Sequence, residues 1–172
     1  MNIPDSVARH VRSRTVIADI SANPETARRR MSAANGQLTK ARNYLAKEDW
    51  EASAIFAESA LMVAFEAYLM GVKLKLGTTA GSHQAMADIT AHLARRAGVA
   101  VEPYQLHDVV DARGAILYHP WDLVAQRELA ESAVDVAAKA VAVLKPFPPL
   151  APAAEPSDES PTGRSHRASR ND

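Results

Sequence analysis

The stretch DWEASAIFAESALMVAFEAYLMGVKLKL, residues 49–76, decides the fold that the sequence predicts. Large apolar residues recur along it at helical spacing, namely Met62, Phe65, Leu69, Val72 and Leu76. Small residues form a second row, namely Ala57, Ala60, Ala64, Ala67 and Gly71. Two apolar rows on one helix indicate burial on most sides, and small residues let a neighbouring backbone come close. We therefore expect a long central helix in an all-α bundle.

Hydrophobic periodicity also predicts the helices around it. They cover residues 24–46, a segment from Ser82 to a stop at Gly98, residues 103–117, and a last segment after Pro120. Asn23 is the expected N-cap of the first helix, and Ser82 that of the third. No run of alternating apolar and polar residues suggests a sheet. The expected architecture is an up-down bundle of four to five helices.

Composition divides the chain into three parts. Residues 1–24 read as a basic N-terminal extension, and residues 25–145 as the helical bundle, with no proline between 25 and 102. Six of the ten prolines fall between residues 146 and 161, followed by polar residues. Such a segment buries too little apolar surface to offset its ordering entropy, so a disordered tail is expected over 146–172. The total length of 172 residues fits one domain.

Charge and cysteine content limit the classes of function. The net charge is zero, yet residues 1–47 hold nine Lys or Arg against three Asp or Glu. A basic segment of this kind suits phosphate or an acidic protein surface, and the alternative is an ordinary solvated helix face. Without cysteine the chain has no disulfide, zinc thiolate or cysteine nucleophile, which favours the cytoplasm. Charged residues interrupt the longest apolar stretch, so no membrane span is expected.

The segment DARGAILYHPWD, residues 111–122, carries the candidate chemistry. Arg113 lies one helical turn from Val110 and from Leu117, so we expect its side chain to leave from the apolar face. A buried guanidinium needs an anion. The candidates are a partner chain, a phosphate, or a carboxylate of this chain, namely Glu58, Glu66 or Asp111.

His119 precedes Pro120 at the junction of the last two predicted helices. Histidine titrates near neutral pH, and arginine stabilises the charge that develops on a phosphorane. Two Arg113/His119 pairs across a dimer axis would form a metal-free site for phosphodiester cleavage. The alternative is an arginine in a structural ion pair and a histidine that caps a helix end.

Arg113, followed six residues later by His119, resembles the signature of HEPN domains (higher eukaryotes and prokaryotes nucleotide-binding). In these all-α bundles a histidine follows an arginine after four to six intervening residues. The likeness covers residues 25–145, including the long central helix and the segment GTTAGSHQAMADITAHL. The resemblance implies a metal-independent endoribonuclease that acts as a homodimer in toxin–antitoxin systems or phage defence. Its substrate would be RNA, and a cognate antitoxin or nucleotidyltransferase would be a further partner.

The resemblance also assigns the site residues. Arg113 would bind and stabilise the scissile phosphate, and His119 would act as general base or acid in attack by the RNA 2′-hydroxyl, which leaves a 2′,3′-cyclic phosphate. A rival hypothesis is a non-catalytic HEPN-like binding or scaffold module, favoured by Gly114, which supplies no side chain next to the arginine. A third is a helical adaptor whose basic first third holds nucleic acid or an acidic protein.

No cofactor or metal is expected. The histidines His83, His92, His107 and His119 include no pair at the i, i+4 spacing that places two ligands on one helix face. Trp50 and Trp121 lie near predicted helix starts, where we expect them to anchor packing.

Overall fold

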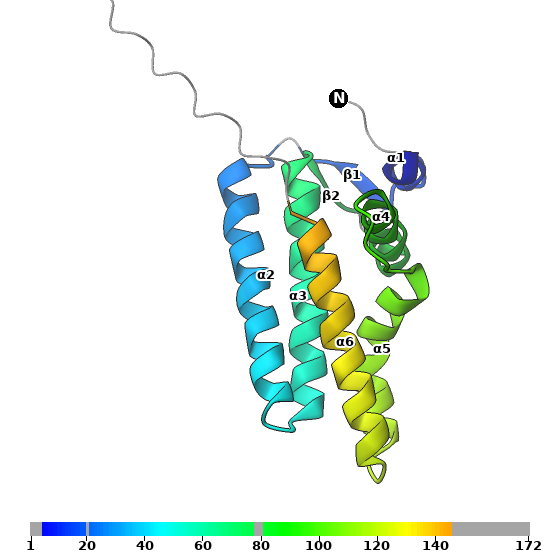
Figure 1. Ribbon diagram of the computed structural model, residues 1–172. Helices are drawn as coiled ribbons and strands as arrows, with labels where there is room; N and C mark the ends of the chain where they lie inside the picture. The colour runs from blue at the N-terminus through cyan, green and yellow to red at the C-terminus, as the bar shows by residue number, and fades with distance from the viewer. Residues whose placement is uncertain (1–4, 20, 78–80, 146–172) are drawn as a thin grey trace, which may run out of the picture.

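The computed structural model describes residues 5–19, 21–77 and 81–145, so the predicted tail at 146–172 lies outside it. The chain is largely helical, which confirms the all-α expectation. Figure 1 shows the long helices packed together, most of them running up and down beside one another. They are α2 (Pro24–Leu45), α3 (Trp50–Gly71), α4 (Ser82–Arg96), α5 (Pro103–Tyr118) and α6 (Leu123–Val143). A short helix, α1 (Asp5–Arg12), precedes them.

The helix boundaries follow from local chemistry. Asn23 has an extended backbone, and its side chain accepts a hydrogen bond from the amide of Glu25, so the predicted N-cap of α2 is confirmed. At α4 the residue before the helix is Gly81, with φ of 103°, and Ser82 is already helical. The predicted N-cap at Ser82 is therefore wrong by one residue. Gly98, with φ of 70°, follows the end of α4 as expected.

A two-stranded antiparallel ribbon departs from the predicted helical pattern. β1 (Val16–Ala18) pairs with β2 (Leu74–Leu76), with Val16 opposite Leu76. The predicted helix over residues 49–76 is thus too long, because α3 ends at Gly71 and Lys73 turns the backbone at φ of 59°. The sequence predicts no sheet, and this prediction is wrong for the ribbon. A Cβ on Gly77 would lie 2.1 Å from the carbonyl oxygen of Arg14, so only glycine fits where the ribbon ends.

The core is centred on α3, which packs most extensively against α2 and also against α5 and α6. Its predicted small-residue row is buried at Ala57, Ala60, Ala64 and Ala67. Among the described helices, α3 is the one long and apolar enough to cross a membrane, judged by length and composition. Ten of its side chains are buried within the bundle, which is the packing of a core helix.

Two hydroxyl groups are buried in this core without a hydrogen-bond partner among the described residues. They are Tyr68 Oη on α3 and Thr90 Oγ1 on α4. Only 2% of the surface of Tyr68 is exposed. Burial raises the pKa of the Tyr68 hydroxyl above its ordinary value of 10.0, and the nearby charge of Arg96 opposes that rise.

Candidate functional site

Arg113 lies on the surface of α5 and not on its buried face. The buried row of this helix passes through Leu106, Val109, Ala112 and Ile116. Arg113 is one position beyond that row, and 54% of its side chain is exposed. The expectation that its charge leaves from the apolar face is therefore wrong.

The partner of Arg113 is Glu51, in the first turn of α3. Arg113 Nε donates a hydrogen bond to Glu51 Oε1 at 3.3 Å. The carboxylates named from the sequence, Glu58, Glu66 and Asp111, are not its partners in an ion pair. Glu66 instead pairs with Arg30 of α2. Because the Arg113–Glu51 pair is exposed to water, it contributes little to stability and can exchange for another anion.

His119 is the C-cap of α5, where the helix ends before Pro120. Its backbone is held on both sides, since its amide donates to the carbonyl of Ile116 and its own carbonyl accepts from Gln126 Nε2 at 2.8 Å. The imidazole is exposed, and no hydrogen bond to it is found within residues 5–19, 21–77 and 81–145. The ring is therefore accessible to a ligand, on a backbone that has a defined conformation.

The two predicted site residues share one end of the bundle but do not contact each other. His119, the C-cap of α5, is six positions after Arg113, which corresponds to about 9 Å along the axis and places the two side chains about one third of a turn apart around it. No hydrogen bond or ion pair joins the two side chains. A single copy of the chain therefore offers two separate polar groups and not a preassembled pair.

The turn between α5 and α6 presents an exposed apolar surface beside His119, and we call residues 117–124 the hairpin tip. Trp121 is 94% exposed and Tyr118 is 86% exposed, with Leu117, Leu123 and Val124 beside them. The expectation that Trp121 anchors packing is therefore wrong, whereas Trp50 does pack against the core. Leu123 and Val124 also line an open groove of about 560 Å³ that Trp50, Glu48 and α6 residues complete. Apolar surface of this extent typically marks an interaction site.

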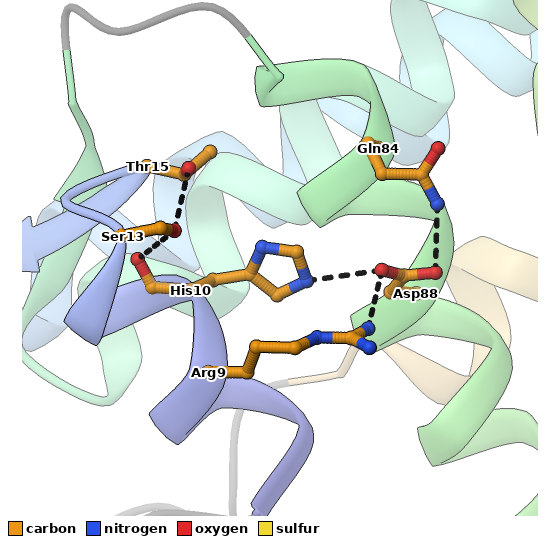
Figure 2. Close-up of polar contacts among 6 residues, drawn as sticks. All are labelled: Arg9, His10, Ser13, Thr15, Gln84 and Asp88. Carbon is orange, nitrogen blue, oxygen red and sulfur yellow. Dashed lines mark hydrogen bonds and ion pairs between the residues drawn. The ribbon is translucent and has the colours of Figure 1, made fainter.

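Sequence reasoning missed a polar cluster that joins α1 to α4 (Figure 2). Asp88 of α4 accepts three hydrogen bonds, from Arg9 at 2.6 Å, from His10 Nε2 at 3.1 Å and from Gln84 at 2.9 Å. Gln84 and Asp88 are four residues apart on one helix, but nothing in the sequence relates them to Arg9 and His10. Only the fold brings these distant residues together.

This cluster has the composition of a catalytic triad but not its geometry. Ser13 Oγ donates to the backbone carbonyl of His10 at 3.1 Å and contacts Thr15 Oγ1 at 2.9 Å. The hydroxyl is thus bonded to main chain rather than to the imidazole, as a serine nucleophile would need to be. The cluster instead attaches the N-terminal helix to the bundle, because both oxygens of its carboxylate accept hydrogen bonds.

The side chains of the described residues include no group of three or more His, Cys, Asp or Glu that could hold a metal ion. The chain matches no family model, no curated protein and no solved structure.

Proposed function

We propose that this chain is an endoribonuclease of the HEPN type that acts as a homodimer, with Arg113 and His119 at the site. The observation that supports the proposal is the exposure of both side chains at one end of α5, directly beside the apolar hairpin tip. A second copy that covered the tip would bring two Arg113/His119 pairs into one cleft. The partner copy is then part of the site, because a single chain does not unite the two groups.

The size of the hairpin tip is consistent with a dimer contact. Two exposed aromatic side chains of about 150–250 Å² each are available, with three exposed aliphatic side chains beside them. Together they supply a large part of the roughly 800 Å² that each partner buries in a standard interface. The groove shared by Leu123 and Val124 gives the aromatic side chains of a second copy a place to pack.

The proposed reaction is transfer of the scissile phosphodiester to the neighbouring 2′-hydroxyl. His119 removes the 2′-hydroxyl proton as the 2′-oxygen attacks phosphorus, and a protonated histidine, such as His119 of the partner subunit, returns a proton to the departing 5′-oxygen. Arg113 stabilises the additional negative charge on the phosphorane oxygens, after it leaves Glu51. The products are a 2′,3′-cyclic phosphate and a 5′-hydroxyl.

A cleavage assay tests this proposal. Labelled RNA is incubated with the wild-type chain in EDTA and compared with Arg113→Ala and His119→Ala, which should each lower the rate by about 100-fold or more. Arg95→Ala and His83→Ala are matched controls, because both remove an exposed side chain of the same type elsewhere, and Arg95 also faces a carboxylate, that of Glu102. Cleavage that survives both site substitutions, or a product with a 5′-phosphate, would overturn the assignment.

The second candidate is a non-catalytic HEPN-like binding module. The observation that favours it is the Arg113–Glu51 ion pair, which gives the arginine a partner within its own chain. Gly114, next to it, adds no functional group to the site. Pure protein that binds RNA in EDTA without cutting it would support this candidate over the nuclease.

A further inference from the structure

We propose that the outer face of α2 binds the phosphodiester backbone of a nucleic acid. This outer face consists of Arg28, Arg29, Lys40 and Arg42, with Lys47 in the turn that follows the helix. It lies on a different helix from Arg113 and His119, and the proposal does not depend on RNA cleavage. Figure 1 shows α2 at the edge of the bundle, so one of its sides has no neighbouring helix.

The charge of this face is of one sign. Residues 26–47 contain six Lys or Arg and no Asp or Glu, and all six basic side chains are exposed. Protein surfaces usually intersperse charges of both signs, because a large field of one sign attracts counter-ions and polyanions. This segment of 22 residues has no carboxylate of its own. Glu25 and Glu66 from outside it pair with Arg29 and Arg30, which leaves four cations without a carboxylate partner among the described residues as a binding surface for an anion.

The cations form two rows along the exposed side of the helix, with Arg28 and Arg42 in one row and Arg29, Lys40 and Lys47 in the other. The buried side chains of α2 hold the opposite face against the bundle, and they include Ala27, Met31 and Leu38. Arg29, Lys40 and Lys47 are separated by multiples of about one turn, so they share the solvent side and span about 27 Å at 1.5 Å per residue. A linear row of this length matches an extended polyanion better than it matches a compact acidic protein.

Most of these cations are available to an external ligand. The side chains of Arg28 and Arg42 form no hydrogen bond or ion pair with the part of the chain that the structure describes. Arg29 pairs with Glu25 at 2.6 Å, but both side chains are largely exposed, and such pairs open at little cost. The ammonium group of Lys40 lies over the ring of Phe56, and that of Lys47 lies over the ring of Tyr44.

Gly36 supplies an independent observation at the centre of this face. Glycine within a helix costs about 0.5–1 kcal/mol relative to alanine, and yet no atom lies within 4 Å of the position that a Cβ would take. Packing in the bundle therefore does not require glycine there. A residue without a side chain between Arg29 and Lys40 instead lets a polymer backbone approach the helix closely.

The test measures binding separately from cleavage. Arg113→Ala/His119→Ala serves as the parent chain, so that RNA is not cut, and its affinity is measured by fluorescence anisotropy for single-stranded RNA and for duplex RNA. The test variant adds Arg28→Gln, Arg29→Gln and Arg42→Gln, which keep good helix propensity. The control variant adds Arg95→Gln and Arg96→Gln, two exposed arginines at the end of α4. Circular dichroism verifies that both variants are folded.

We expect the α2 variant to bind RNA about tenfold more weakly at low salt. The slope of log affinity against log salt concentration should also become shallower by about two, because each lost phosphate contact contributes roughly 0.7–0.9 to that slope. The control should change either quantity far less. A stronger effect on one RNA form identifies whether single strands or duplexes are the ligand. Equal losses in the two variants, or an α2 variant that binds as its parent does, would overturn the proposal and leave an acidic protein as the ligand to examine. The absence of cleavage by the wild-type chain would overturn the proposed nuclease alone.

Discussion

Arg113 Nε donates a hydrogen bond to Glu51 Oε1, so a carboxylate from the start of α3 holds the arginine of the proposed site. Carboxylate and phosphate oxygens are alternative ligands for the same guanidinium. In the proposed site Glu51 would therefore compete with RNA for Arg113, and the strength of this exposed ion pair would set how readily the site accepts a phosphate.

Replacing Glu51 by glutamine should raise the affinity for RNA. Exposed ion pairs contribute about 0.2–1 kcal/mol, so the gain is expected to be at most about fivefold, with thermal stability nearly unchanged. Affinity is measured for wild type, Glu51→Gln and Asp135→Asn, where the last releases the exposed Lys139 of α6 as a control. An unchanged or weaker affinity of Glu51→Gln would show that Arg113 does not contact RNA.

Trp121→Asp should convert the proposed dimer into a monomer. The side chain is 94% exposed, so its loss leaves the core intact, whereas a charge at the hairpin tip prevents apolar contact between copies. Light scattering gives the mass, and thermal unfolding should show a change within about 0.5 kcal/mol. Tyr104→Asp, at an exposed tyrosine near the start of α5, is the control. A wild-type chain that is already monomeric contradicts the proposed assembly.

Asp88→Ala should release α1 from α4. Arg9 and the nearly buried His10 would lose their shared acceptor, and removing the partner of a buried donor costs about 1–3 kcal/mol. Thermal unfolding and faster amide exchange in residues 5–12 would report the change. Asp135→Ala, which breaks only an exposed pair with Lys139, should have almost no effect. Equal effects of the two substitutions would mean that the cluster does not hold α1.

Tyr68→Phe should leave stability at neutral pH unchanged or raise it by up to about 1 kcal/mol, because the buried hydroxyl has no partner to lose. The pKa of Tyr68 is raised in the folded chain, so the unfolded chain loses this proton at lower pH. Wild-type stability therefore falls as the pH rises above 10.0, and the phenylalanine variant lacks that contribution. Denaturant unfolding at neutral and alkaline pH measures both effects, with Tyr104→Phe as an exposed control. A marked loss of stability at neutral pH would contradict the absence of a partner.

The positions of the long helices could be predicted because each helix has its own periodic apolar pattern and its own residues that favour a helix start or end. Asn23 and Pro24 mark the start of α2, and Pro103 marks that of α5. The ribbon could not be predicted in the same way. Its strands are only three residues long, too short for alternation to show, and their pairing joins segments that are distant in the sequence.

The predicted position of Arg113 on the apolar face of α5 is wrong for a different reason. The large apolar residues of α5 predict a row that includes Val110 and Leu117, and Arg113 is in line with that row. The buried row passes through Ala112, a residue that occurs equally well on either side of a helix. In a chain this rich in alanine, the large residues alone define the buried face only to within about one position, and the difference decides whether an arginine is buried or exposed.

The buried alanines of α3 make the chain's tolerance of mutation asymmetric. Where helices meet through methyl groups, a change to glycine or serine removes or alters only a few atoms, so a neighbour can adjust. A change to valine or leucine at Ala57, Ala60 or Ala64 must instead push a whole helix away, because these positions have no exposed surface. Substitutions at these three positions of α3 are therefore expected to be confined to small residues, whereas the exposed side chains of α2 and of the hairpin tip can change in size without disturbing the core.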